Sequence, residues 1–219
     1  MTATASARTL LPPRLATGRI IAVLRAPRVD ALAPVCDVLV EEGILGLELT
    51  LTTPDLLGSV RRLIDRYSGS ADVGLGTVTT TEQAQQGIDA GAAFLVTPAM
   101  NLPVIDRAVA SSIAVIPGGL TPSELITGWD AGATAVKIFP AQTVGPDYLR
   151  HLHGPFPGLP AVPSGGIDLD STHDWLAAGA VAVSLGGPLL GDALTGGDLE
   201  QLRERCRAIR AVVDHAPRT

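Results

Sequence analysis

The sequence is almost devoid of lysine. Its 219 residues include 16 basic side chains, and one of these is Lys137 while the others are arginines. Lysine is normally a common residue, so this near-absence draws attention to the one position that keeps it. Lys137 lies within an apolar run, residues 132–140. Burial favours the neutral amine over the ammonium, and a neutral amine is a nucleophile toward carbonyl carbons. Lys137 is therefore a candidate reactive group.

Other scarcities exclude whole classes of function. Aromatic residues make up 3% of the chain and the net charge is −6, so no basic surface that would bind nucleic acid is expected. The chain has two cysteines, Cys36 and Cys206, which we interpret as reduced thiols rather than a disulfide. No uninterrupted apolar stretch of about 18 residues indicates a membrane span, and residues 1–19 lack the pattern of a secretory signal. These features predict a soluble, cytoplasmic protein without a membrane partner.

Short apolar runs bounded by glycine or proline recur along the chain, whose hydrophobic fraction is 46%. Runs that are apolar on both faces are typical of parallel strands buried on both sides. The expected strands are Ile20–Arg25, Gly46–Leu51, Val73–Val78, Phe94–Pro98, Ile113–Pro117, Ala135–Phe139, Ala161–Ser164 and Ala182–Leu185.

Helical patterns separate these runs. The expected helices are Asp30–Glu42, Pro54–Tyr67, Thr81–Ala90, Thr121–Asp130 and Asp170–Ala178. Glycines such as Gly91 and Gly132 follow several of them, as expected where a helix ends in the left-handed conformation. Alternating strands and helices predict an α/β fold, namely a (β/α)8 TIM barrel. A doubly wound open sheet is the alternative, but it usually has a glycine-rich sequence after the first strand, which is lacking here.

We expect one domain over residues 1–219. No linker or low-complexity segment divides the chain. Residues 1–18 are predicted to hold an extra helix, over about Ala7–Gly18, that caps the amino-terminal end of the barrel. Residues 198–215 are predicted to form an amphipathic closing helix.

Polar residues occur at the carboxyl ends of the predicted strands, where barrels of this kind place their active sites. Alternation along a strand puts Glu48, Thr50 and Thr52 on one face, opposite three leucines. Lys137 and Phe139 share a face in the same way. We therefore expect a carboxylate and an amine that both point into the barrel. A buried structural ion pair is the alternative interpretation.

Two glycine pairs, Gly165–Gly166 and Gly186–Gly187, follow the last two predicted strands. Backbone amides at these positions often hold a phosphate in such barrels. His151 and His153 form the one closely spaced histidine pair, and they are interpreted as part of a solvated loop because no third ligand is evident. No metal site is predicted.

Several motifs together resemble a known family, the 2-keto-3-deoxy-6-phosphogluconate (KDPG) aldolases, which often also cleave 4-hydroxy-2-oxoglutarate (KHG). The resemblance extends from about Ile20 to Asp192. The motifs, in order, are Glu48-Leu-Thr50, Gly76-Thr77-Val78, Val96-Thr97-Pro98, Ile116-Pro117-Gly118, Lys137-Ile-Phe139-Pro140, Gly154-Pro-Phe156-Pro157 and Ser164-Gly-Gly166.

The resemblance implies a class I aldolase that needs no metal or cofactor and forms a Schiff base with its substrate. It implies cleavage of a small 2-keto-3-deoxy sugar acid phosphate or a hydroxy-oxo diacid to pyruvate and an aldehyde, and a homotrimer. Lys137 matches the Schiff-base lysine and Glu48 the general acid/base. The implied substrate-binding residues are Arg25, Thr52, Thr77, Pro98, Phe139, Ser164, Gly165, Gly166, Gly186 and Gly187.

Two positions depart from the family pattern. Thr52 stands where many members have an arginine near the substrate carboxylate, and Arg25 is the candidate replacement for that cation. Pro188 stands where members usually have serine, which removes a hydroxyl and an N–H from the phosphate end. A galactonate-specific aldolase therefore stays open, as do a phosphate-binding barrel isomerase or synthase in which Lys137 only holds an anion, and a catalytically silent scaffold.

Overall fold

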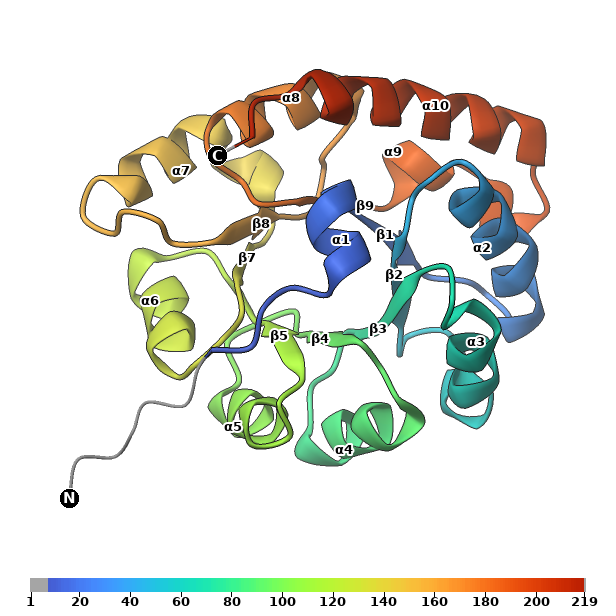
Figure 1. Cartoon of the computed structure of the whole chain (residues 1–219), viewed down its shortest axis with the longest axis horizontal. Coiled ribbons are helices and arrows are strands. Elements are labelled where there is room, and N and C mark those ends of the chain that lie inside the picture. The colour runs from blue at the N-terminus through green and yellow to red at the C-terminus, as the bar shows by residue number, and fades with distance from the viewer. Residues whose placement is uncertain (1–7, 219) are drawn as a thin grey trace.

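The structure is a computed structural model that describes residues 8–218. The strands form a ring at the centre and most helices lie around it (Figure 1). The strand segments of the described chain are β1 Ile20–Leu24, β2 Gly46–Thr50, β3 Asp72–Gly76, β4 Phe94–Val96, β5 Ala114–Ile116, β6 Gly118–Gly119, β7 Val136–Ile138, β8 Ala161–Pro163 and β9 Val183–Leu185. The helices are α1 Pro13–Gly18, α2 Leu32–Glu41, α3 Val60–Tyr67, α4 Thr81–Ala90, α5 Leu102–Ala110, α6 Pro122–Asp130, α7 Pro146–His153, α8 Leu169–Ala177, α9 Gly187–Leu190 and α10 Leu199–His215.

All paired strands are parallel. One sheet has the order β5-β4-β3-β2-β1-β9 and the other the order β6-β7-β8. Ser164 and Ser184 form a bridge between the sheets on one side. On the other side the amide of Thr134 donates to the carbonyl of Val115, over 2.9 Å. The architecture is therefore an α/β fold with a curled parallel sheet, and the open doubly wound alternative is not observed.

Two layers of apolar packing hold the sheet. The larger one lies between the strands and the surrounding helices. The smaller one fills the interior of the ring toward the amino-terminal ends of the strands, and Phe94 and Ile21 belong to it. Helix α1 lies over the middle of the ring (Figure 1) and inserts Leu15, which is fully buried, into this inner cluster. The amino-terminal end of the ring is therefore closed by side chains.

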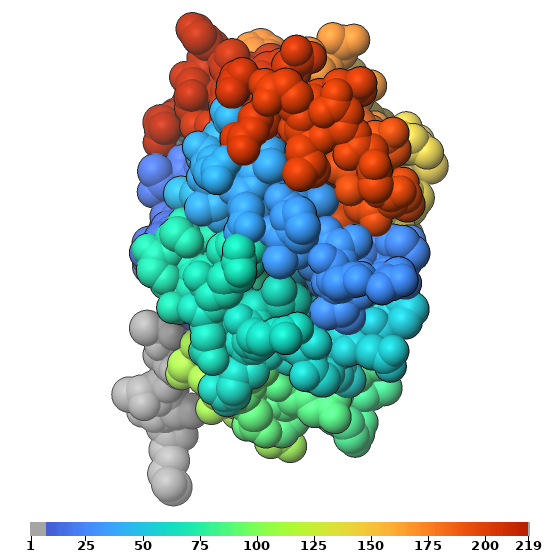
Figure 2. Space-filling view, turned by 90° about the vertical axis from the view of Figure 1, so that its right-hand side faces the viewer, coloured from blue at the N-terminus to red at the C-terminus, as the bar shows by residue number. Residues whose placement is uncertain are grey.

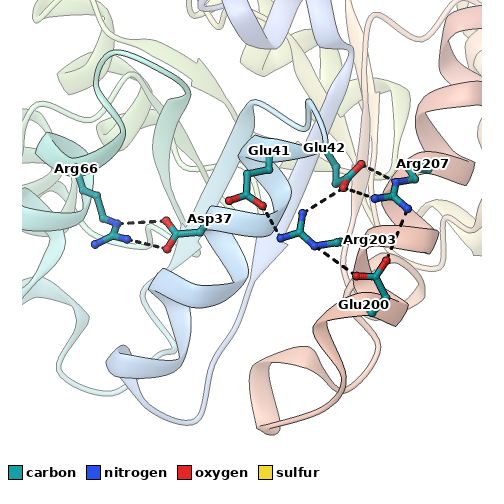
Figure 3. Close-up of polar contacts among 7 residues, drawn as sticks. All are labelled: Asp37, Glu41, Glu42, Arg66, Glu200, Arg203 and Arg207. Carbon is teal, nitrogen blue, oxygen red and sulfur yellow. Dashed lines mark hydrogen bonds and ion pairs between the residues drawn. The ribbon is translucent and has the colours of Figure 1, made fainter.

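Helix α10 packs beside α2 on the outside of the molecule, where the red and light-blue surfaces meet in Figure 2. Arg203 and Arg207 on α10 both form ion pairs with Glu42 at the end of α2, at 3.2 and 2.9 Å (Figure 3). Glu41 and Glu200 extend the network. Charges thus reinforce the contact between the first and last long helices of the chain.

The helix starts follow from local chemistry. Thr121 accepts a hydrogen bond from the amide of Glu124, whose carboxylate accepts one from the amide of Thr121, which is a capping box. Asp168 caps α8 in the same way through Ser171. Gly91 and Gly132 have φ values of 87° and 99°, so the left-handed helix ends that the sequence predicted are confirmed.

Three expected helices or loops differ from the structure. The helix expected from Pro54 begins only at Val60, because Asp55 has a left-handed backbone (φ 57°) and a short 3-10 turn follows it. The front helix is only the six residues of α1, since Pro12 stands at its N-cap and Pro13 opens its first turn; Ala7 lies outside the described residues. His151 and His153, expected in a loop, lie in the last turn of α7, and α5 was not expected at all.

Candidate active site

A cavity of about 390 Å³ opens at the carboxyl ends of the strands. Eleven of the twelve residues that the sequence selected line it, and only Thr52 does not. They come from or directly follow β1, β2, β3, β4, β7, β8 and β9, so residues far apart in the chain meet in one place. The eleven are Arg25, Glu48, Thr77, Pro98, Lys137, Phe139, Ser164, Gly165, Gly166, Gly186 and Gly187.

The two candidate catalytic side chains are both buried in this cavity. Glu48 is 1% exposed and Lys137 is 7% exposed. Burial raises the pKa of the Glu48 carboxyl, and the nearby charges of Lys137 and Arg25 offset part of that rise. Glu48 Oε2 has no hydrogen-bond partner among the described residues. A buried carboxyl oxygen without a partner is costly for a structural role, so it is free to act on a ligand.

Gly76 makes room for Glu48. A Cβ atom placed on Gly76 would lie 2.0 Å from Oε1 of Glu48 and 2.5 Å from its Cδ. The two residues lie on neighbouring parallel strands, with Glu48 opposite Gly74 and Thr50 opposite Gly76. The glycine of the Gly-Thr-Val motif therefore fixes where the carboxyl group lies.

The Lys137 amine lies beside an aromatic ring. Its Nζ is 5.0 Å from the centre of the Phe139 ring, which is a cation–π distance when the amine is charged. Phe139 is itself 39% exposed and stands at the mouth of the cavity. Alternation along β7 placed both side chains on the inner face, and the structure confirms that they line the same cavity.

Arg25 and Thr52 lie in different environments. Arg25 directly follows β1, lines the cavity, and makes no ion pair within residues 8–218. Thr52 is exposed and its hydroxyl bonds to that of Thr50 over 3.0 Å. Strand β2 ends at Thr50 and the chain turns, with the amide of Thr53 donating to the Thr50 carbonyl. The strand and its alternation end at Thr50, so Thr52 lies in the turn and not in the cavity wall.

The two glycine pairs line the cavity, and their amides make no hydrogen bond within the described chain. In the described chain, the N–H groups of Gly165, Gly166, Gly186 and Gly187 donate to no other residue. Gly165 and Gly166 have φ values of 88° and 77°, a region that other residues adopt only with strain. Successive free amides around a concavity favour an anion. The geometry is therefore that of an anion-binding loop.

Thr77 and Ser164 provide hydroxyl groups between these ends. The Thr77 backbone is left-handed, with φ 59°, which is rare for a β-branched residue and costs of order 1–3 kcal/mol. Ser164 is buried and its hydroxyl donates to that of Ser184 over 3.3 Å. Pro98 lines the same cavity. Strain concentrated at a cavity wall is typical of a site that positions a ligand.

Sequence reasoning missed part of the cavity wall. Ser184 could have been found, because alternation along the last strand turns it inward. Val23 lies in β1, two residues before Arg25, and the others follow β9 in short helical turns that carry no periodic signal. The missed residues are Val23, Ser184, Leu190, Gly191, Leu194 and Thr195, whereas Pro188, which the sequence placed at the phosphate end, also lines the cavity.

The described part of the chain holds no group of three or more histidine, cysteine, aspartate or glutamate side chains placed to bind a metal ion. None of its helices has the length and apolar character required to cross a membrane.

Comparison with known proteins gives consistent matches. Residues 12–204 match the model of the family described as KDPG and KHG aldolase. The 2-dehydro-3-deoxy-phosphogluconate aldolase of Dickeya dadantii is 35% identical over 196 residues, covering 88% of this chain and 91% of that protein. The 2-dehydro-3-deoxy-6-phosphogalactonate aldolase of Escherichia coli is 33% identical over 78% of this chain and 83% of its own length.

A solved structure adds chemical information. KDPG aldolase from Legionella pneumophila, with pyruvate captured as a covalent carbinolamine intermediate, superposes with a TM-score of 0.82. It is 28% identical in sequence, and the match covers 90% of this chain and 96% of that one.

Proposed function

Since the chain belongs to the KDPG and KHG aldolase family, we propose that it is a class I aldolase. It cleaves 2-keto-3-deoxy-6-phosphogluconate to pyruvate and glyceraldehyde 3-phosphate, and 4-hydroxy-2-oxoglutarate to pyruvate and glyoxylate. The observation that carries the proposal is the buried pair of Lys137 and Glu48 at one cavity, with one Glu48 oxygen left without a partner among residues 8–218.

Lys137 starts the reaction. Its neutral amine attacks the C2 ketone carbon of the substrate, and loss of water from the resulting carbinolamine leaves an iminium. The iminium nitrogen then accepts the electron pair of the C3–C4 bond as that bond breaks. Release of the aldehyde leaves an enamine on Lys137. Phe139, at the mouth, limits the access of water to this nitrogen.

Glu48 moves the protons. As the C3–C4 bond breaks, its carboxylate takes the proton of the C4 hydroxyl, and the same proton can return to C3 of the enamine. Hydrolysis of the new iminium frees pyruvate and Lys137. The raised pKa of Glu48, caused mainly by burial, suits a group that must both accept and donate a proton.

Anion contacts orient the substrate. We assign the substrate carboxylate to Arg25, which lies within electrostatic reach of Glu48 and makes no ion pair in the described chain. Thr77, Pro98 and Ser164 line the pyruvyl end. The four glycine amides hold the phosphate or the second carboxylate. Pro188 contributes neither N–H nor hydroxyl there, so phosphate affinity should be modest. Thr52 plays no direct part.

One experiment tests the mechanism directly. The protein is incubated with pyruvate, reduced with borohydride, and its mass and peptides are determined. Aldol chemistry through Lys137 adds one pyruvyl group to the peptide that contains Lys137. Because the chain has no second lysine, an adduct can otherwise form only on the α-amino group. No adduct at saturating pyruvate, or an adduct only on the α-amino group, would reject the proposal.

Lys137→Met is the control, and it should lose both the adduct and cleavage. An isomerase or synthase that uses Lys137 only to hold an anion would show no adduct in the parent protein. The galactonate-specific alternative differs at C4 of the substrate. Cleavage rates for the gluconate and galactonate epimers, each with and without the phosphate, distinguish these specificities.

We also propose the finer architecture and assembly. If β5 and β6 are one strand interrupted at Pro117, the curled sheet is an eight-stranded barrel. The hydrogen bond from the amide of Lys137 to the carbonyl of Pro117, over 2.8 Å, supports this. Family resemblance suggests a homotrimer, and light scattering on the purified protein tests it.

A further inference from the structure

A second cavity, of about 530 Å³, lies at the opposite end of the strands. Arg19, Pro160 and Val181 in its wall come just before β1, β8 and β9, whereas the candidate active site lies where strands end. No residue lines both cavities. The volume falls in the range that small-molecule sites occupy.

This cavity is lined by three cations and no acids. Arg8, Arg19 and Arg218 contribute to its wall, which contains no aspartate or glutamate. None of the three forms an ion pair with a carboxylate of residues 8–218. In a chain with a net charge of −6, three arginines around one cavity without an acidic side chain from residues 8–218 are unexpected on composition alone.

Two of the guanidinium groups are held in place before any ligand arrives. Arg8 stacks on Trp129, 3.5 Å from the ring centre, and donates to the carbonyls of Trp129 and Ala133 over 2.8 and 2.6 Å. Arg19 is 6% exposed and donates to the carbonyls of Pro217 and Ala180 over 2.7 and 3.2 Å. Fixed donors lose less conformational entropy when a ligand binds.

A purely structural role accounts for only part of this arrangement. Arg19 ties two backbone carbonyls together, but a guanidinium has five N–H donors, and carbonyls do not neutralise its charge. Burial and the neighbouring Arg218 both lower the pKa of Arg19. The cation is thus retained against desolvation and against a like charge, and a bound anion would relieve both.

We propose that this cavity is a binding site for a small organic anion. A carboxylate or phosphate head lies between Arg19 and Arg218, and an apolar body lies against Leu10, Leu11 and Val181, which line the same cavity. Leu10 is 81% exposed. The site is separate from the aldol chemistry, and its test is independent of that reaction.

Trp129 supplies a local signal for the test. Full-length protein is titrated with phenyl phosphate while tryptophan fluorescence is recorded; the other tryptophan, Trp175, is 1% exposed and does not line the cavity. The expected result is a saturable change that Trp129→Phe abolishes. Benzoate should bind as well, whereas phenol, which has the same body without the charge, should bind at least about tenfold more weakly.

Matched variants decide the assignment. Arg218→Gln should weaken phenyl phosphate binding about tenfold, while Arg150→Gln, which removes an equal charge from exposed α7, should not. Affinity in the parent protein should also fall as sodium chloride is raised. Absence of a saturable signal from Trp129, equal affinity for phenol, or unchanged binding in Arg218→Gln would each overturn the proposal.

Discussion

Two buried carboxylates on neighbouring strands behave differently: one opens β3 at the amino-terminal end of the ring, and the other lies in the middle of β2 and lines the cavity. Asp72, at the start of β3, is 6% exposed; it accepts the amide of Leu15 over 2.8 Å and pairs with Arg14 at 3.5 Å. Glu48, in the neighbouring strand β2, is 1% exposed and leaves Oε2 without a partner in the described chain. A satisfied buried acid stabilises the fold, whereas an unsatisfied one is kept for a ligand.

Among the variants that test this difference between Asp72 and Glu48, Glu48→Gln should have the largest effect on activity. The amide can neither take the C4 hydroxyl proton nor return it, so kcat should fall about a hundred- to ten-thousandfold. The borohydride-trapped pyruvate adduct on Lys137 should still form. Steady-state cleavage and mass spectrometry measure both. Full activity in this variant would show that another group carries the proton.

The same variant should change the pH dependence of stability. Because burial raises the pKa of Glu48 above its value in the unfolded chain, the native state holds a proton that the unfolded state has released. The free energy of unfolding therefore falls as pH rises from the unfolded pKa through the folded one. Glu48→Gln should lose this slope and be more stable than the parent protein at neutral pH. Urea unfolding at several pH values tests this.

A smaller loss of activity is expected from Gly76→Ala. The added Cβ would collide with Glu48 Oε1 at 2.0 Å, so the carboxyl must move while Lys137 keeps its place. We expect kcat to fall about tenfold to a hundredfold with KM little changed, since a misplacement of about 1 Å can cost about a hundredfold. Gly58→Ala is the control, because a Cβ there meets nothing within 4 Å. Equal activities would remove the positioning role of Gly76.

Alternation and strand-end logic predicted most of the candidate site because both depend on short-range geometry. The inward direction of Glu48 and Lys137 follows from strand periodicity alone, and parallel strands necessarily bring their carboxyl ends together. The pair Gly165–Gly166 was recognisable for a similar reason, since its positive φ values favour glycine.

Features that depend on where a strand stops were not predictable. Thr52 keeps the alternating pattern in sequence, yet the hydrogen bond from the Thr53 amide to the Thr50 carbonyl ends the strand before it. The wall from Leu190 to Thr195 and the arginine-lined cavity arise from tertiary packing of turns and of α1. No local periodicity in the sequence predicts such packing.

At the amino-terminal end of the ring, Asp72→Asn should affect stability and not catalysis. Asparagine keeps an acceptor for the Leu15 amide but loses the charge that faces Arg14. A decrease of about 1–2 kcal/mol in the free energy of unfolding is expected, with kcat unchanged. Urea denaturation and steady-state kinetics on one preparation compare it with Glu48→Gln. A loss of kcat as large as that of Glu48→Gln would end the distinction between the two acids.

The smallest effect on stability is expected from Glu42→Gln. Glu42 directly follows α2 and lies outside the sheet. Hydrogen bonds from Arg207 and then Arg203 lower the pKa of Glu42 below its usual value (Figure 3). The folded state thus favours the carboxylate, and this contribution to stability is present above the unfolded pKa and lost as pH falls through the folded one.

Ion pairs at the surface contribute little in water, so Glu42→Gln should lower the free energy of unfolding by less than Asp72→Asn does. The decrease should be confined to the higher pH range, and salt should reduce it. Glu204→Gln, on the opposing helix α10 and without an ion pair in the described chain, is the control. If the two variants unfold alike at neutral pH and at pH 3, the network between α2 and α10 adds no stability, and the apolar contact alone holds these helices together.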